Sequence, residues 1–544
     1  MKAIELENDK TKSFFKDRYI WLLLIISLSV RIYLSFFTYV IKNDSVHFMQ
    51  NAKFFSNGDF SSALGHDYHP LYSLIMAIVY KAIPNMELSG TIVSVFFGTL
   101  TVIIFYLIGK KIFDQKVSFV SSIILAFHPY AVRFSADIIS ESTYFFFFIS
   151  ALGLGYFAIT NRKLLLFALT GICSAFAYLA RPEGIGIVII VASFCAFKDC
   201  TKINALWKEK LVSIFVLVLP FIIFSIPYLV YIKKETGHWD LTKKKKLAIV
   251  AGLDKLLSGQ NNSGLIEGGS EKKESSSVQI NNQKAAERVD FKIHLECIAY
   301  IVKRYLGTFH YLLCVFLIIG VINWTRIKQE RFFGFYLTSI IVFYLFILYR
   351  LGISYMLSAS DIYAPSRRHL MSLVIPAIFF VGIGIHTTGT WMHEKFQSNS
   401  FIVGFKESLK STWIVQLLVL MVVVSVLLPK TLKPQRVDRI GIKEVAHWLK
   451  ENSHKPFLVI LSDSARIAYY AGGNHVQKGR YHSDLLTEAI QKNVDYIFFT
   501  YRDYRVMEKK LQQLVKDKKI VLAYHYPEKK PLKKHSVLLY EVLR

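Results

Sequence analysis

Carboxylate side chains stand at the borders of long apolar runs in this sequence. Asp44 follows the first run, in YVIKNDSVHFMQNAKFF, and Glu141 directly precedes the run STYFFFFISALGLGYF. Asp137 lies four residues before Glu141, so on a helix the two would share a face. An ionised carboxylate can take a proton from an attacking hydroxyl group, and one at membrane depth is costly unless it faces a polar cavity or a partner. Asp44 and Glu141 are therefore the candidates for a catalytic role.

Basic and aromatic side chains occur at similar borders. Arg367 and Arg368 precede an apolar run in YAPSRRHLMSLVIP, and His69 belongs to HDYHPLY. The forked donors of Arg match phosphate oxygens. We predict that His69, Arg368 and Arg367 bind a phosphate group. Further residues are predicted to line the same cavity: His66, Tyr72, Asp137 and Arg133.

Each of these residues also has a plainer explanation. Most single Asp residues after a membrane helix are helix-end residues, and His69-Pro70 fits the start of a helix. Asp137 and Arg133 have the spacing of a helical salt bridge. The two arginines before Leu370 fit surface anchors, and Arg181 and Glu183 in ARPEGIG fit a turn pair between two helices.

Membrane helices must position these residues. The chain has 544 residues, 53% of them hydrophobic, and runs of membrane-spanning length recur along most of it, which predicts an all-α polytopic membrane domain. We expect about eleven transmembrane helices, near 19–41, 90–109, 117–132, 141–160, 164–180, 183–197, 211–232, 298–323, 332–350, 370–388 and 412–429.

The run 70–84 is short and begins and ends at Pro. We expect it to be interfacial or re-entrant, because the basic loops then alternate as the positive-inside rule demands. The N-terminus and the loops that contain Lys110, Arg162 and Lys208 then lie in the cytoplasm. All the candidate residues fall on the outer face. The formal charge of +27 is explained by these loops and by anionic lipid head groups rather than by nucleic acid.

The sequence divides into a membrane domain, 1–430, and an extracytoplasmic α/β domain, 431–544. In the first outer loop, 42–89, the positions Val46, Phe48, Met49, Ala52 and Phe55 predict one face of a surface helix. Residues 253–290 are rich in Ser, Gly, Asn and charge and predict a flexible outer insertion. The tail contains the strand-like runs PFLVILSD, VDYIFFTY, KIVLAYHY and SVLLYEVL, and the helical segments IKEVAHWLKEN and YRVMEKKLQQLVKDK.

One reaction fits carboxylates and cations around a cavity at the outer membrane surface. A sugar linked to a polyprenyl phosphate would lie with its tail between helices and its phosphate against Arg or His. A carboxylate would activate an acceptor hydroxyl for attack on the anomeric carbon. The chain contains no nucleotide-binding motif, which agrees with a lipid-linked donor.

The order of several motifs resembles a known family. The first helix contains Arg31 in SLSVRIYL, and NDSVHFMQNA, HPLYSLIMAIVY and GKKIFDQK follow in turn. A pattern with Ser-Glu then runs from Pro129 to Tyr144, and Arg368, His369, Leu370 and Pro376 begin a late helix. VAHWLKEN and ARIAYYAGG are similar to tail motifs. The chain thereby resembles the C-type membrane glycosyltransferases, in the branch of the dolichyl-phosphate-mannose protein mannosyltransferases and the lipid A aminoarabinose transferase.

The resemblance implies roles for individual residues. Asp44 matches the acidic residue that activates the acceptor, Glu141 the second acidic position, and His69 and Arg368 basic residues near the donor phosphate. Relatives often have an Asp-Glu pair where this chain has Asp44 and Ser45. No cofactor is assigned, and a divalent cation held by Asp44 and Glu141 stays an open alternative.

The sequence as a whole predicts a glycosyltransferase in a bacterial inner membrane, with inverting transfer from a polyprenyl-phosphate sugar to an unidentified envelope acceptor. Two other functions stay open. A transporter or flippase for a lipid-linked substrate would need buried charges at mid-membrane depth. A non-catalytic membrane anchor for a binding module would leave the acidic and basic residues unexplained.

Overall fold

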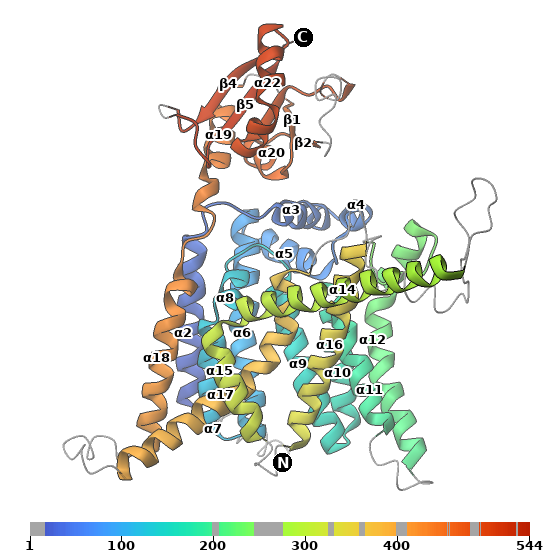
Figure 1. The fold of residues 1–544 in the computed structure, drawn as a ribbon, viewed down its shortest axis with the longest axis vertical. Coiled ribbons are helices and arrows are strands. Elements are labelled where there is room, and N and C mark those ends of the chain that lie inside the picture. The colour runs from blue at the N-terminus through green and yellow to red at the C-terminus, as the bar shows by residue number, and fades with distance from the viewer. Residues whose placement is uncertain are drawn as a thin grey trace.

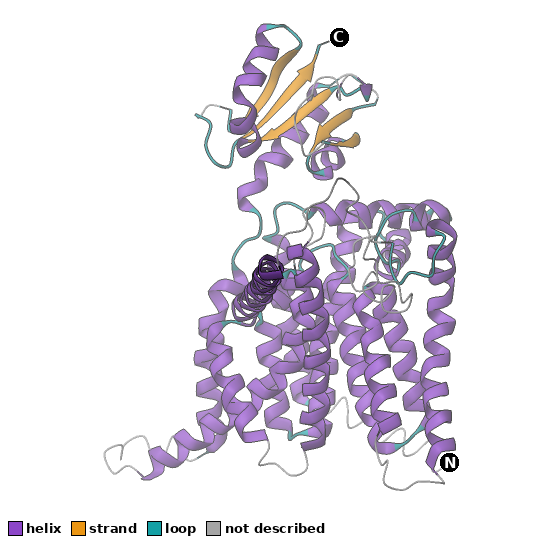
Figure 2. Cartoon of the chain, turned by 45° about the vertical axis from the view of Figure 1, so that its right-hand side comes forward, coloured by secondary structure: helices purple, strands orange, loops and turns teal. Residues whose placement is uncertain are grey.

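The computed structural model describes residues 17–197, 206–243, 276–324, 331–357, 365–398, 411–453, 455, 457–478, 489, 491–528 and 531–543. A bundle of helices carries a small unit with a sheet at one end (Figure 1). Among the residues just given, strands occur only in the small unit (Figure 2). The end of the bundle next to this unit is called the upper end below.

The bundle is all-helical, as the apolar runs predict. Its longer helices are α2 (Arg18–Phe36), α6 (Met86–Ile112), α7 (Gln115–Phe127), α9 (Glu141–Asn161), α10 (Leu164–Ala180), α11 (Ile185–Phe197), α12 (Leu206–Thr236), α14 (Ser276–Phe309), α15 (Tyr311–Trp324), α16 (Arg331–Leu357), α17 (Arg367–Ser398) and α18 (Thr412–Leu432). Shorter helices at the upper end are α3 (Asn43–Ser56), α4 (Phe60–Leu64), α5 (Leu71–Ala82) and α8 (Pro129–Ser135).

Fewer helices are long enough to cross a membrane than the sequence predicts. Among the described residues, seven helices have the length and apolarity of a span, and two bent pairs raise the number to nine. The predicted spans 164–180 and 183–197 are helices, but each is shorter than this criterion requires. Every predicted span is helical over most of its length, so the membrane domain is confirmed, whereas the number eleven stays a prediction.

One predicted span is wrong in its geometry. Residues 298–323 do not form one straight helix, because α14 and α15 meet at a bend of 98°. His310 stands between them with a φ of 83°, a conformation that a right-handed helix cannot continue through. In Figure 1 α14 lies across the bundle while α15 runs along it.

The predicted flexible insertion is only partly described. Residues 253–275 lie outside the described residues. Residues 276–290 form the first part of α14, and the flexibility of the insertion stays a prediction. Helix α14 continues without a break into the apolar residues after 290, and helix formation is cooperative along such a segment.

The first loop contains the predicted surface helix. Val46, Phe48, Met49, Ala52 and Phe55 of α3 are all buried, so the apolar face that the sequence predicts is confirmed. Helix α5 has 12 residues, too few for the ~20 that cross a bilayer, and it lies below α3 at the upper end (Figure 1). The Ser73 hydroxyl donates to the Phe48 carbonyl at 3.0 Å, which fixes α5 against α3.

The C-terminal unit has a sheet of five strands in the order β2-β1-β3-β5-β4. The strands are β1 (Val459–Ser462), β2 (Asn474–Gln477), β3 (Tyr496–Thr500), β4 (Ile520–Tyr526) and β5 (Val537–Val542), and the helices are α19 (Ile440–Asn452), α20 (Ala465–Ala471) and α22 (Tyr501–Lys516). Strand β1 pairs in parallel with β2 and β3, whereas β5 is antiparallel to β3 and β4. The sequence predicts this α/β unit but not β2 or α20. Strand β2 has the sequence NHVQ, which is too short and polar to be recognised as a strand.

Candidate active site

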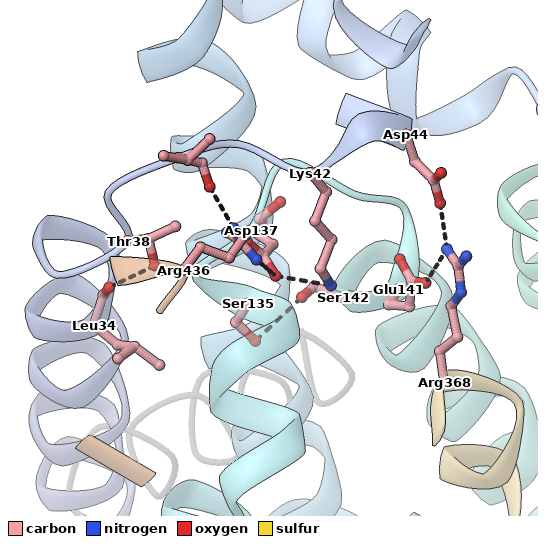
Figure 3. Close-up of polar contacts among 12 residues, drawn as sticks. Leu34, Thr38, Lys42, Asp44, Ser135, Asp137, Glu141, Ser142, Arg368 and Arg436 are labelled. Atoms are coloured by element: carbon pink, nitrogen blue, oxygen red, sulfur yellow. Dashed lines mark hydrogen bonds and ion pairs between the residues drawn. The ribbon is translucent and has the colours of Figure 1, made fainter. Parts of the chain in front are cut away.

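Three helices bring two carboxylates onto one arginine at the upper end of the bundle. Nη1 of Arg368 donates to Oδ2 of Asp44 at 2.6 Å and to Oε1 of Glu141 at 3.3 Å (Figure 3). Asp44 lies in the first turn of α3 and Glu141 in the first turn of α9, where the helix dipole favours a negative charge. The predicted meeting of Asp44, Glu141 and Arg368 is therefore present.

A second arginine extends this group on the other side of Glu141. Nη1 of Arg181 donates to Oε1 of Glu141 at 2.9 Å, and Nη2 donates to Oε1 of Glu183 at 2.8 Å. The predicted turn pair of Arg181 and Glu183 thus exists, but it also belongs to the site. The sequence offered one signal for it, an ARPEG segment between two apolar runs. We name Asp44, Glu141, Glu183, Arg181 and Arg368 the ion network.

The two catalytic candidates differ in exposure. The Asp44 side chain is 22% exposed and that of Glu141 is 1% exposed. Tyr68 donates its hydroxyl to Oδ1 of Asp44 at 3.1 Å. Oε2 of Glu141 is buried and accepts no hydrogen bond from the described residues. A substrate can therefore reach Asp44 directly, whereas Glu141 acts mainly on the arginines around it.

The loop before Glu141 is held by polar contacts to the first helix. Nε of Arg31 donates to Oγ of Ser135 at 3.3 Å, and Oγ of Ser142 donates to the same Ser135 oxygen at 3.1 Å. Arg31 is 1% exposed, so these bonds partly compensate its burial. They fix the turn from which α9 and Glu141 begin.

Asp137 belongs to a different group of charges. Nζ of Lys42 lies 2.8 Å from Oδ2 of Asp137, and Arg436 donates to both carboxylate oxygens (Figure 3). Burial alone would raise the pKa of Asp137, but Lys42 and Arg436 outweigh burial and lower that pKa. The expected pair of Asp137 with Arg133 is not formed. We name Lys42, Asp137 and Arg436 the linker clasp, because Arg436 lies on the segment that enters the C-terminal unit.

The predicted candidates His69, Tyr72 and His66 contact other aromatic and backbone groups. The His69 ring packs between Tyr178 and Tyr228, with centroid distances of 5.2 and 5.0 Å. The Tyr72 hydroxyl donates to the Gly90 carbonyl at 2.9 Å, inside the contact of α5 with α6. His66 packs against His47 at 5.1 Å. Phosphate binding by His69 stays a prediction, and so does the place of Tyr72 and His66 in the cavity.

Arg367 and Arg133 meet at an aromatic ring rather than at the carboxylates. Their guanidinium carbons lie 5.0 and 5.8 Å from the centroid of the Tyr130 ring, and Nζ of Lys430 lies 5.1 Å from it. The two adjacent arginines of α17 thus point to different groups. Arg368 contacts the carboxylates, and Arg367 contacts Tyr130.

The arrangement does not fit a divalent cation between Asp44 and Glu141. The guanidinium group of Arg368 already lies between their oxygens. Among the described residues no group of three or more His, Cys, Asp and Glu side chains could hold a metal ion. Hard divalent cations usually require several oxygen ligands, so the positive charge that the two carboxylates need comes from Arg368.

A family comparison matches part of the N-terminal half of the chain. The family model described as "Dolichyl-phosphate-mannose-protein mannosyltransferase" matches residues 67–231. This range includes Glu141, Arg181 and Glu183 but not Asp44 or Arg368. No curated protein sequence matches the chain.

Solved structures match nearly the whole fold. ArnT from Cupriavidus metallidurans bound to undecaprenyl phosphate has a TM-score of 0.54 and 10% identity, over 96% of this chain and 97% of that chain. The oligosaccharyltransferase AglB from Archaeoglobus fulgidus, in complex with an inhibitory peptide and a dolichol-phosphate, has a TM-score of 0.52 and 12% identity, over 89% of this chain and 69% of that chain. At 10–12% identity these two structures show that the chain shares their fold.

Proposed function

We propose that this protein is a membrane glycosyltransferase that moves a sugar from a polyprenyl-phosphate donor to a hydroxyl group of an envelope acceptor. The observation that carries the proposal is the convergence of Asp44 and Glu141 on one nitrogen of Arg368, at the upper end of a polytopic helical bundle. A carboxylate that is partly exposed at such an edge can meet both a lipid and a water-soluble acceptor.

The comparisons support the donor class. The matched family is described by dolichyl-phosphate-mannose, and the two similar structures were solved with undecaprenyl phosphate and with a dolichol-phosphate. These molecules share a phosphate on a long isoprenoid chain. A donor of this class needs no nucleotide-binding motif, and the sequence contains none.

In the proposed reaction Asp44 is the general base. Its carboxylate accepts the proton of the acceptor hydroxyl while the hydroxyl oxygen attacks the anomeric carbon. The bond from that carbon to the phosphate oxygen breaks, and the polyprenyl phosphate leaves with the bonding electron pair. Attack from the face opposite the phosphate inverts the anomeric configuration.

Arg368 and Glu141 position this base. Arg368 holds Oδ2 of Asp44, while the Tyr68 hydroxyl holds Oδ1, so the carboxylate has a defined orientation. Glu141 in turn holds Arg368 and Arg181. A base that is fixed in this way loses little entropy when the acceptor binds.

We also propose that the upper end faces the outside of a cytoplasmic membrane. The basic loops around Lys110 and Lys163 join helices at the end opposite the C-terminal unit, as the positive-inside rule requires for the cytoplasmic side. Lipid-linked sugars, unlike nucleotide sugars, are available at the outer surface.

Replacement of Asp44 tests the reaction. Asp44→Asn keeps the size of the side chain but removes its basicity, so we expect transfer to fall by about 10²–10⁴-fold. The measurement is incorporation of label from polyprenyl-phosphate sugars into envelope acceptors, using membranes with equal amounts of protein.

Asp59→Asn is the matched control in the same loop. Asp59 caps α4 through its side chain, and Asn caps helices equally well, so transfer should be unchanged. Transfer at the wild-type rate by Asp44→Asn would contradict the assignment of the base.

A further inference from the structure

One helix of the C-terminal unit presents a row of cations to solvent. Helix α22 buries Met507, Leu511 and Leu514 against the sheet. Four exposed cations stand on the opposite side of the helix: Arg502, Arg505, Lys509 and Lys516. Their spacing keeps them within about 60° of one another around the helix axis, over a length of ~21 Å. We name these four residues the basic row.

The basic row has no acidic partner. Among the described residues, none of its four members forms an ion pair with Asp or Glu. Two acids of the helix are engaged elsewhere, because Asp503 forms a capping box with Thr500 and Glu508 accepts from the Tyr504 hydroxyl at 3.1 Å. The row therefore presents uncompensated positive charge to the solvent.

The stability of the helix does not explain the basic row. Arg502 lies in the first turn of α22, where the helix dipole disfavours a positive charge. Arg505 follows Arg502 by three residues and precedes Lys509 by four, and like charges at these spacings destabilise a helix. Only Lys516, in the last turn, suits the dipole. A helix that had only to stay soluble would be served by both signs of charge on this face.

Membrane topology does not explain the basic row either. The positive-inside rule concerns cytoplasmic loops, whereas the C-terminal unit lies on the proposed outer side. Residues 431–544 nevertheless contain 22 of the 66 Lys and Arg residues of the chain. Helix α20 contacts α3 through the Ala465 amide and Asn43, and α22 lies farther from the bundle than α20 (Figure 1). The row is therefore not needed to hold the unit on the bundle.

The shape of the basic row indicates the kind of partner. Four cations in a line match a chain that repeats its negative charges. The forked donors of Arg suit phosphate and carboxylate oxygens. The other exposed side chains on this side of the helix are Val506, Gln512 and Gln513, so no aromatic ring is present on which the bases of a single-stranded nucleic acid could stack.

We propose that the basic row binds a linear polyanion of the cell envelope, a polymer that carries phosphate or carboxylate groups along its chain. The proposal names a class of acceptor, and to that extent it rests on the proposed function. The binding site itself does not depend on the chemistry at Asp44.

Binding of a charged polymer tests the proposal without any turnover. The full chain is reconstituted in phosphatidylcholine nanodiscs, and its affinity for labelled dextran sulfate is compared with its affinity for uncharged dextran of equal length. The double variant Arg505→Gln/Lys509→Gln should weaken binding of dextran sulfate by about tenfold, the value of two exposed charge contacts. Binding of dextran sulfate should also fall steeply as salt is added, and dextran should not bind.

Lys433→Gln/Lys450→Gln is the matched control. It removes the same charge from two exposed positions, one in the linker and one on α19, which packs on the other face of the sheet, so affinity should be unchanged. Arg505→Lys should also keep the affinity, which separates loss of charge from loss of fold.

Three results would overturn the proposal. Equal weakening by the two double variants would show that net charge, rather than the basic row, binds the polymer. Unchanged binding in Arg505→Gln/Lys509→Gln would remove the site. Binding to phosphatidylglycerol vesicles that depends on the basic row as strongly as binding of dextran sulfate does would assign the row to a membrane surface.

The outcome is independent of the proposed base. If Asp44→Asn remains active while Arg505→Gln/Lys509→Gln loses affinity, the assignment of the base fails and the polyanion site stands. If Arg505→Gln/Lys509→Gln binds normally while Asp44→Asn is inactive, only the polyanion site fails.

Discussion

At the scale of single residues, the site depends on shared charges rather than on isolated pairs. Oε1 of Glu141 accepts from Arg181 and from Arg368, so one buried oxygen serves two cations. Glu183 gives Arg181 a second acceptor. Removing one partner from a buried group of this kind leaves another charge uncompensated, which costs far more than losing an exposed pair.

Arg181→Gln should therefore destabilise the protein strongly. The Arg181 side chain is 12% exposed, and its replacement removes the arginine that pairs with Glu183. We therefore expect the free energy of unfolding to fall by about 3–5 kcal/mol. Thermal unfolding in detergent measures the effect. The double variant Arg181→Gln/Glu183→Gln should recover part of the loss, because it also removes the orphaned charge.

The exposed Lys163→Gln at the opposite end of the bundle serves as control and should change stability by no more than about 0.5 kcal/mol. If Arg181→Gln unfolds at the wild-type temperature, the prediction is wrong, because the ion network then does not contribute to stability.

At the scale of elements, the C-terminal unit contacts the helix that carries Asp44. Asn43, the residue before Asp44, accepts hydrogen bonds from the Ala465 amide at 2.9 Å and the Ser464 hydroxyl at 3.1 Å. The Tyr470 hydroxyl accepts from the Ile41 amide at 3.0 Å. Helix α20 therefore fixes the start of α3, and the linker clasp fixes the segment before it.

Opening the linker clasp should loosen this contact. Arg436→Gln leaves Asp137 with Lys42 alone, and we expect faster cleavage of the linker by trypsin and a lower kcat with little change in KM, because Asp44 becomes less well oriented. Lys433→Gln, an exposed change in the same linker, should do neither. Equal proteolysis and equal kcat in both variants would show that the C-terminal unit does not position Asp44.

The linker clasp should also resist moderate acid. Because the pKa of folded Asp137 is lowered, its contribution to stability is present above its unfolded pKa of about 3.9 and is lost only as the pH falls through the lower folded value. The two linker variants can therefore be compared at any pH from about 5 to 8 without titrating this carboxylate.

At the scale of the whole molecule, the bundle gathers its charges at one end. Figure 3 shows Asp44, Glu141 and Arg368 near the linker clasp, and α3 and α8 lie at the end of the bundle next to the C-terminal unit (Figure 1). The loop that contains Lys163 lies between α9 and α10 at the other end. A border between membrane and water suits the proposed reaction of a lipid-linked donor with an envelope acceptor.

Labelling of single cysteines tests this orientation in intact cells. In a chain whose native cysteines are replaced by alanine, Lys450→Cys in the C-terminal unit should react with a membrane-impermeant maleimide. Lys163→Cys should react only after the membrane is permeabilised. The reverse pattern would place the site in the cytoplasm and would remove the argument for a donor at the outer surface.

The sequence by itself determined the membrane class, the α/β tail and the catalytic candidates. Membrane-spanning runs and basic loops can be recognised from neighbouring residues, because the free energy of moving each side chain from water into lipid depends on that side chain itself. The buried face of α3 was also predictable, because its period is that of a helix. Asp44 and Glu141 were identified because the charge pattern puts both on the outer face and because the order of motifs resembles a known family.

Only the tertiary structure decided which charges meet. The sequence predicted Arg181 to be a turn residue, but it pairs with Glu141 in the site. Asp137 pairs with Arg436, from the segment that enters the C-terminal unit, instead of with Arg133. These partners are separated by 40 and 299 residues, and no local pattern links them. Burial makes each charge require a partner, but the packing of helices decides which partner is within reach.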